Sequence, residues 1–262
     1  MSQQKSLTYA SYLRLPELLD QQRPLSAEHD ELLFITIHQV YELWFKQWLH
    51  ELKFLRESLE AGRTPQVLAT LKRILTILKT LVAQVDILET MTPLSFSAFR
   101  SRLEAASGFQ SFQFRAIEFL LGYRRAEALE QYPTGSSERA ELERLRGEPS
   151  IYQSFLRYLQ VNGVSLPAAA LARDPRSAPA ADAGVQTALL TVYRTLPVQA
   201  QICERLVDLD EGLQEWRYRH LKMVERTIGA KPGTGGSAGA EYLRGTLFRP
   251  LFPDLWAIRA EL

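Results

Sequence analysis

The stretch DELLFITIHQVYELWFKQWLHELKFLRESLE, residues 30–60, decides the fold class. Its apolar residues recur at steps of three and four, the spacing that places side chains on one face of an α-helix. The stripe consists of Leu33, Ile37, Tyr41, Trp44, Trp48, Leu52, Leu55 and Leu59. Because no Gly or Pro interrupts it, we expect one long amphipathic helix from about Asp30 to Glu60.

A second helix should follow directly. Thr64 is suited to cap its start and Pro65 to occupy its first position, since Pro has no N–H to leave unpaired there. The apolar stripe then continues with Leu68, Leu71, Leu75, Leu78, Val82, Val85 and Leu88. The short connection between the two stripes predicts an antiparallel pair of helices.

A third long stripe runs through the C-terminal part of the chain. It starts at Ile202, includes His220, and reaches Ile228 with helical spacing. Gly229 follows at once, and a Gly at this place commonly ends a helix in the left-handed αL conformation. We therefore expect a helix from Ile202 to Ile228 that carries a histidine among apolar residues.

The remaining segments predict shorter elements. We expect helices after Pro93, from Phe109 to Leu121, near 138–146 and at 149–161, and an irregular connection from Asn162 to Ala183, which is rich in Ala and Pro. No segment alternates apolar and polar residues as a half-buried strand does. The sequence thus predicts an all-α bundle of long amphipathic helices in a single domain, residues 1–262.

Composition narrows the function. The formal net charge is +1, which argues against a surface that binds nucleic acid, so we expect a small-molecule partner. Cys203 is the only cysteine, which excludes an intramolecular disulfide, a cysteine-ligated iron–sulfur cluster and covalent c-type haem attachment. The N-terminal residues lack an apolar signal core and no stretch approaches the roughly 18 apolar residues of a membrane span. We expect a cytoplasmic protein.

The four histidines fall into two groups. His29 and His50 adjoin acidic residues, and we interpret them as surface residues. His220 lies in the apolar stripe, where an imidazole is costly to bury unless a ring nitrogen has a partner. That partner could be a metal, a backbone carbonyl or a carboxylate, and the spacing alone does not choose among them.

Two pairs of residues four positions apart predict shared helix faces. Phe34 and His38 place an aromatic wall beside an imidazole, and Phe96 with Arg100 places an aromatic ring beside a guanidinium. A guanidinium grips a carboxylate through two parallel hydrogen bonds, so the second pair suits a ligand with an apolar body and a carboxylate. The alternative is that Arg100 only pairs with a surface acid.

The segment GTGGS at 233–237 predicts a loop. It lacks the Lys-Ser/Thr pair and the preceding strand that a phosphate-binding P-loop requires. It does present the Thr234 hydroxyl on glycine-rich backbone, which suits closure over a polar ligand, although many such turns have no function.

Taken together, several segments resemble the tryptophan 2,3-dioxygenase family. They are LTYASYLRL at 7–15, HDELLFITIHQVYELWFKQ at 29–47, ASGFQSFQFR at 106–115, EWRYRHLKMVERTIG at 215–229, GTGGS at 233–237 and FPDLW at 252–256. They occur in family order and span nearly the whole chain.

The resemblance implies a role for each matching residue. His220 would be the proximal ligand of a non-covalent haem b, and His38 would hydrogen-bond the indole N–H of L-tryptophan in the distal pocket. Phe34 would line the indole pocket, Arg100 would bind the substrate carboxylate, and Thr234 would contact the ammonium and carboxylate groups.

The resemblance also implies a shared active site in an oligomer. Ser107 matches a distal-pocket position, and Phe96 stands where several bacterial relatives carry a Tyr that helps hold the carboxylate. Tyr9, Tyr12 and Leu13 match residues that reach a neighbouring subunit, so the N-terminal segment 1–28 would do so in a homotetramer built as a dimer of dimers.

The implied reaction inserts both atoms of O2, the co-substrate, across the indole C2–C3 bond and gives N-formyl-L-kynurenine. Two alternatives stay open. One is a related haem monooxygenase or dioxygenase that acts on a methylated tryptophan in secondary metabolism, and the other is a haem-binding helical protein without turnover. Three departures from the family pattern motivate the first alternative: Phe96, Pro232 before the glycine loop, and Asp174-Pro175 in place of a familiar Asp-Trp.

Overall fold

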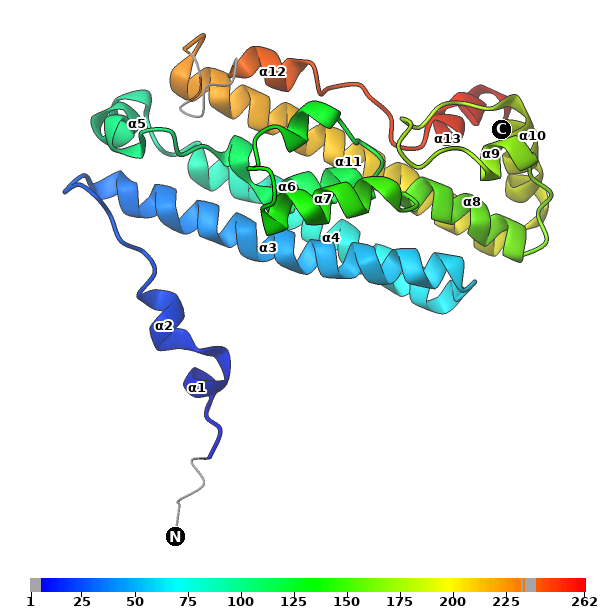
Figure 1. Ribbon diagram of the computed structural model, residues 1–262, viewed down its shortest axis with the longest axis horizontal. Helices are drawn as coiled ribbons and strands as arrows, with labels where there is room; N and C mark the ends of the chain where they lie inside the picture. The colour runs from blue at the N-terminus through cyan, green and yellow to red at the C-terminus, as the bar shows by residue number, and fades with distance from the viewer. Residues whose placement is uncertain (1–5, 232, 234–238) are drawn as a thin grey trace.

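Three long helices form the body of the molecule (Figure 1). The structure, a computed structural model, describes residues 6–231, 233 and 239–262, and within these ranges it contains helices and no strand. The α-helices are α1 (Tyr9–Leu13), α2 (Leu15–Leu19), α3 (His29–Glu60), α4 (Thr64–Leu88), α5 (Pro93–Arg100), α6 (Phe112–Leu120), α7 (Ser137–Gly147), α8 (Ile151–Val161), α9 (Ala168–Leu171), α10 (Ala183–Thr195), α11 (Pro197–Ile228), α12 (Ala240–Arg244) and α13 (Pro253–Ala257). The all-α prediction is confirmed.

The helix α4 lies at the centre of the bundle, packed against both α3 and α11. The predicted stripes of α3 and α4 supply much of the buried core, which also includes Leu206, Leu209 and Leu213 of α11. The approach of α11 to α4 is close at Gly212, where a Cβ atom would lie 2.7 Å from Leu78 Cδ2. A larger residue at position 212 would require the Leu78 side chain to move out of its place in the core.

Several helix boundaries differ from the predicted ones. Thr64 is the first residue of α4 rather than its cap, and its hydroxyl forms a 2.6 Å hydrogen bond with the Tyr158 hydroxyl instead. The helix α11 begins at Pro197, one turn before the predicted start, because Pro is tolerated in a first helical turn. Gly229 ends α11 with φ of +62° as expected, but its ψ of −132° lies outside the αL region, so the chain leaves the helix in a more extended direction.

The segment 162–183 is largely irregular, as predicted, with the one-turn helix α9 inside it. Its backbone is held by side chains from elsewhere: Arg124 donates to the Pro175 carbonyl (2.6 Å) and Gln153 to the Arg173 carbonyl (3.0 Å). These bonds replace the backbone hydrogen bonds that a helix would have made. The sequence analysis did not predict α10, α12 or α13.

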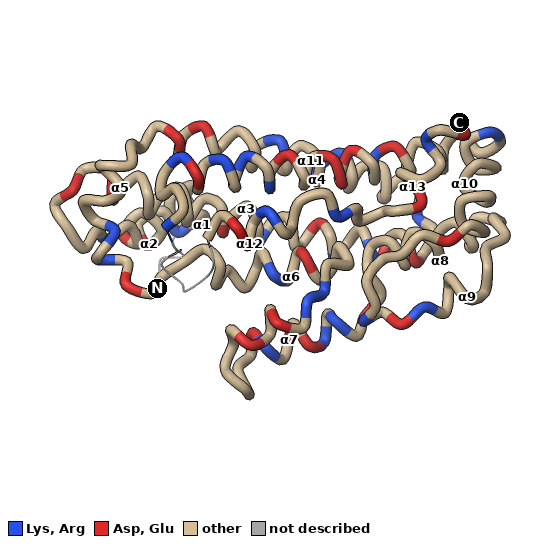
Figure 2. The backbone as a smooth tube through the Cα atoms, turned by 90° about the horizontal axis from the view of Figure 1, so that it is seen from above, with Lys and Arg blue, Asp and Glu red and all other residues tan. Residues whose placement is uncertain are grey.

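The two ends of the bundle are built differently. At one end lie α5, α12 and the C-terminal part of α11, and at the other lie α8, α9, α10 and α13 (Figure 1). The helix α7 projects from the side, and acidic and basic residues alternate along it (Figure 2). None of the described helices combines the length and apolarity that a membrane crossing requires.

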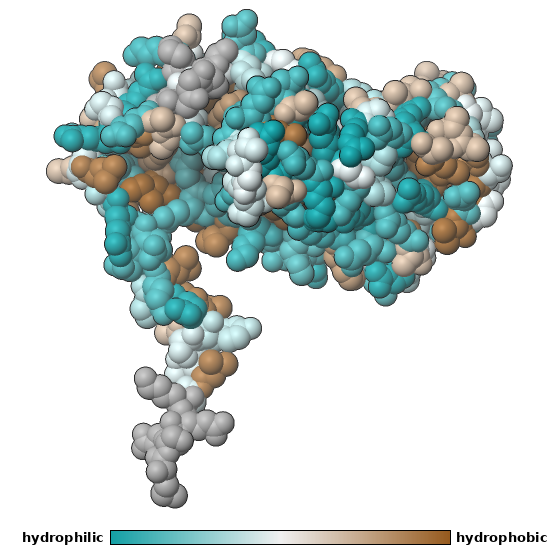
Figure 3. Space-filling model, viewed as in Figure 1, coloured by the Kyte–Doolittle hydropathy of each residue, from teal (hydrophilic) through white to brown (hydrophobic). Residues whose placement is uncertain are grey.

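The segment that carries α1 and α2 extends away from the bundle as an arm (Figure 1). Apolar side chains are exposed along it, among them Tyr9 (76% exposed) and Tyr12 (70%) (Figure 3). The arm joins α3 through the buried Glu31 carboxylate, which accepts hydrogen bonds from the backbone N–H groups of Leu25 (2.7 Å) and Ser26 (2.8 Å).

Candidate functional site

One cavity lies at the end of the bundle formed by α3, α5, α11 and α12. Its volume, measured as the space open to the centre of a water molecule, is about 260 Å³. On the same measure a single water needs roughly 10–15 Å³. The cavity therefore has room for a ligand far larger than a few waters. Its wall is mostly apolar and aromatic, which is typical of a site for a planar organic ligand.

Six of the residues singled out from the sequence line this cavity. They are Phe34, His38, Phe96, Arg100, Ser107 and His220. They come from α3, α5, α11 and the connection after α5, so the fold brings together segments separated by more than 180 positions in the chain. Their individual roles remain predictions, but they do share one site.

The other predicted residues lie elsewhere or cannot be placed. Tyr9, Tyr12 and Leu13 are exposed on the arm and are not part of this cavity within one chain. Thr234 falls outside the described residues, although Gly233 and Gly239 on either side of it line the cavity.

His38 is held in one tautomer by its own helix. Its Nδ1 lies 2.7 Å from the Phe34 carbonyl oxygen, one turn earlier in α3. A carbonyl can only accept, so Nδ1 carries the proton and Nε2 keeps a lone pair. Burial lowers the pKa of His38, and the hydrogen bond to Phe34 opposes this only in part. The site thus contains a neutral imidazole with a free acceptor nitrogen.

Aromatic rings pack around Phe34, the ring beside this imidazole. The Phe34 ring centre is 4.1 Å from that of His38, 5.7 Å from that of Phe96 and 5.6 Å from that of Phe99. Such a wall suits a flat aromatic group whose polar edge can reach the acceptor nitrogen of His38.

His220 faces the cavity from α11. Its ring is stacked on Trp216, with centres 5.1 Å apart and planes inclined by 18°. Burial lowers the pKa of His220 to about 4, and the nearby Arg115 guanidinium adds to the effect. A neutral imidazole is the form that ligates a metal, so His220 could hold one at physiological pH.

The sequence analysis missed a charged group in the same wall. Glu118 of α6 is buried and contacts Arg115 and Arg217, and Tyr242 of α12 lies beside Arg115. All four line the cavity. A signal existed, because Arg115 and Glu118 interrupt the otherwise apolar helix FQFRAIEFL, and Arg217 precedes His220 by one turn.

Comparison with known proteins identifies the family of the chain. The family model described as tryptophan 2,3-dioxygenase matches residues 1–157 and 170–262. The chain belongs to the tryptophan 2,3-dioxygenase family.

Several curated members of this family are similar over their whole length. The chain is 60% identical to the tryptophan 2,3-dioxygenase of Herpetosiphon aurantiacus, over 98% of the chain and 99% of that protein. Identity is 61% to the one from Anaeromyxobacter sp. strain K (98% and 97% covered) and 43% to the one from Bordetella parapertussis (98% and 92%). The family model leaves out residues 158–169, where α8 ends and the irregular segment begins.

Proposed function

We propose that this protein is a haem-dependent dioxygenase that inserts O2 across the indole C2–C3 bond of L-tryptophan and forms N-formyl-L-kynurenine. The observation that carries the proposal is the pairing of two neutral imidazoles, His38 and His220, on different helices of one apolar cavity. The names of the full-length relatives support the substrate and the reaction.

The residues fit a haem held without a covalent bond. A haem iron needs a ligand from the protein besides the porphyrin nitrogens, and within the described residues no hydrogen bond engages the ring of His220. His220 would therefore hold the haem iron, with Trp216 stacked on its ring. When bound, haem supplies the iron at which O2 becomes reactive.

The chain's own residues would orient the substrate. The indole would lie beside Phe34 and Phe96, with its N–H donating to Nε2 of His38. Arg100, on the same face of α5 as Phe96, would bind the carboxylate through two hydrogen bonds. Holding the reactants in this geometry in a cavity that excludes water is the main contribution that the protein can make.

The direct experiment is turnover of the hemin-reconstituted, reduced protein with L-tryptophan under labelled O2. We expect a product that carries two labelled oxygen atoms, measured by mass spectrometry. A product with one labelled atom would instead identify a monooxygenase, and retained haem without any product would identify a binding protein.

A second experiment tests the role of His38. N1-methyl-L-tryptophan lacks the indole N–H, so the wild-type protein should bind it more weakly than L-tryptophan by about fivefold or more, the effect of one neutral hydrogen bond. The variant His38→Ala should lose this discrimination, whereas His29→Ala, which changes an exposed histidine of the same helix, should keep it. Equal discrimination in His38→Ala would remove His38 from the substrate site.

We also propose that the N-terminal arm completes the site of a neighbouring copy in a homotetramer. Exposed Leu7, Tyr9, Tyr12 and Leu19 on an arm that leaves the bundle would gain most from burial against another chain. Replacing Tyr9 and Tyr12 by Ser should weaken both assembly, measured by light scattering, and tryptophan binding. Loss of neither would contradict the proposal.

A further inference from the structure

The buried carboxylate of Glu118 is surrounded by more positive charge than it can balance. It forms ion pairs with Arg115 from its own helix, with Arg217 of α11 (3.0 Å) and with Arg125 (3.5 Å). Three guanidinium groups and one carboxylate leave a net charge of +2. Glu118, Arg115 and Arg217 are each at most 5% exposed, so solvent screens this charge poorly. We call Arg115, Arg125 and Arg217 the arginine cluster.

The arginine cluster also has unused donors. The Nε atoms of Arg115, Arg125 and Arg217 are buried, and within the described part of the chain none has a hydrogen-bond partner. Buried N–H groups are paired in most proteins, so unpaired donors on three neighbouring side chains need an explanation.

Aromatic rings stabilise part of the positive charge of the cluster. The guanidinium carbons of Arg125 and Arg217 both lie 4.8 Å from the centre of the Tyr123 ring, and Arg125 lies 4.9 Å from that of Tyr242. Such contacts are favourable for a cation. However, a ring supplies no counter-charge, and the net charge of +2 remains.

The cluster borders the haem cavity proposed above. Arg115, Glu118, Arg217 and Tyr242 line it, and Arg217 precedes His220 by one helical turn. The lowered pKa of His220, to which the charge of Arg115 contributes, is consistent with this proximity. The cavity is also lined by the carboxylate of Glu42 and by apolar residues, among them Val85, Leu88 and Phe45.

We propose that the arginine cluster is the site that receives the carboxylate side chains of the tetrapyrrole. This inference rests on the proposed function, since it assumes that haem is the ligand of the cavity. Haem b has an apolar macrocycle and two propionates, and Arg115 and Arg217, whose Nε donors have no partner within the described residues, are the members of the cluster that line the cavity. The substrate carboxylate is assigned to Arg100, which comes from α5 and not from this cluster.

The first test changes the ligand and uses the wild-type protein. Its result therefore does not depend on whether a variant folds. Apoprotein is titrated with hemin and with hemin dimethyl ester, whose propionates are uncharged, and binding is followed by the Soret absorption. We expect the ester to bind at least about tenfold more weakly, the effect of losing a charged hydrogen bond.

Variants then locate the effect. Arg115→Gln should weaken the binding of hemin but not of the ester, so the two affinities should converge. Arg217→Gln, which changes the other arginine of the cluster that lines the cavity, should act in the same direction if Arg115→Gln does not fold. Arg144→Gln changes an arginine of α7 outside the cavity and should leave the affinity ratio at its wild-type value.

The outcomes separate the two proposals. If hemin and its ester bind wild-type protein with equal affinity, the arginine cluster does not receive the propionates, while the proposed function stands. If neither produces a Soret shift on addition to folded protein, haem is not the ligand and both proposals fail.

Discussion

Two buried carboxylates, at opposite ends of the bundle, show how differently those ends are built. Asp254 of α13 and Glu118 of α6 are 1% and 2% exposed. Asp254 accepts from neutral donors: the Tyr152 hydroxyl, the backbone N–H of Asp182 (2.7 Å) and the Gln186 amide (2.9 Å). Glu118 is instead surrounded by three guanidinium groups.

The difference indicates which end is complete without a ligand. At the far end, the chain's own polar groups satisfy the carboxylate, and the result is a structural hydrogen-bond network. At the site end, Glu118 pairs with three arginines whose Nε donors have no partner within the described residues. Substitutions at the site end should therefore act on ligand binding, and those at the far end on stability.

The largest effect is expected for His220→Ala. Loss of the axial ligand should weaken hemin binding by at least about 100-fold, beyond the 10- to 100-fold typical of residues that only support a metal ligand. Stability of the apoprotein should change little, because His220 faces a cavity. Hemin titration and urea unfolding measure the two quantities, with His50→Ala, on the surface of α3, as control. Hemin retention in His220→Ala would assign the iron to another residue.

Arg100→Ala should affect the substrate and not the haem. Removing a charged hydrogen bond to the carboxylate should raise the KM for tryptophan by roughly 10- to 150-fold. For tryptamine, which lacks the carboxylate, the KM should be the same in the wild-type protein and in Arg100→Ala. The neighbouring exposed Arg102 provides the control Arg102→Ala. If wild-type protein used tryptamine as well as tryptophan, Arg100 would have no role in recognition.

At the far end, Asp254→Asn should reverse this pattern. An amide cannot accept all three hydrogen bonds, so one buried donor loses its partner, at a cost of about 1–3 kcal/mol in the free energy of unfolding. Hemin affinity should stay at its wild-type value. Urea unfolding tests the first expectation, with the exposed Asp208→Asn as control. A variant of normal stability with weakened hemin binding would contradict the division between the two ends.

The sequence predicted the long helices because their signal is local. The stripes in α3 and α4 repeat over many turns, and only their ends were misplaced. The helix α10 was missed although Asp182 caps it and Val185, Leu189 and Val192 form its buried face, because the Ala- and Pro-rich residues before it read as one irregular segment.

The site was predictable only in part, for a related reason. His38 and Phe34 share a helix face, so their proximity follows from spacing, and the roles of Arg100 and His220 came from the family resemblance. The contact of Arg217 with Glu118 joins residues 99 positions apart, and no periodicity reports such a pairing. The tautomer of His38 likewise depends on a distance that only coordinates provide.

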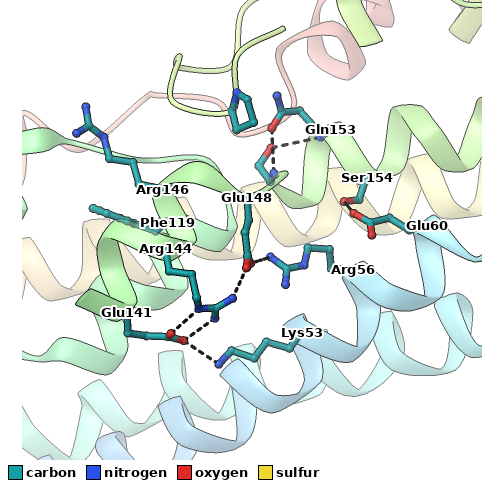
Figure 4. A network of polar contacts seen from close by, with 12 residues as sticks. Lys53, Arg56, Glu60, Phe119, Glu141, Arg144, Arg146, Glu148, Gln153 and Ser154 are labelled. Carbon is teal, nitrogen blue, oxygen red and sulfur yellow. Dashed lines mark hydrogen bonds and ion pairs between the residues drawn. The ribbon is translucent and has the colours of Figure 1, made fainter. Parts of the chain in front are cut away.

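The smallest effect should come from the surface network that joins α7 to α3 (Figure 4). Arg144 donates to both oxygens of Glu141 (2.7 and 2.8 Å), and Lys53 of α3 lies 3.2 Å from the same carboxylate. These hydrogen bonds, that from Arg144 first, lower the pKa of Glu141 from 4.5 to about 2. The folded protein thus favours the ionised carboxylate more than the unfolded chain does.

The contribution of Glu141 to the free energy of unfolding should depend on pH. A lowered pKa contributes stability that is complete above pH 4.5 and is lost as the pH falls towards 2. Glu141→Gln should therefore cost about 1 kcal/mol or less at pH 7, the usual range for exposed ion pairs, and the cost should shrink below pH 4.5. Urea unfolding of the apoprotein at pH 7 and pH 3.5 measures it, with Glu143→Gln on the same helix as control. A cost that is independent of pH would show that Glu141 acts through packing and not through its charge.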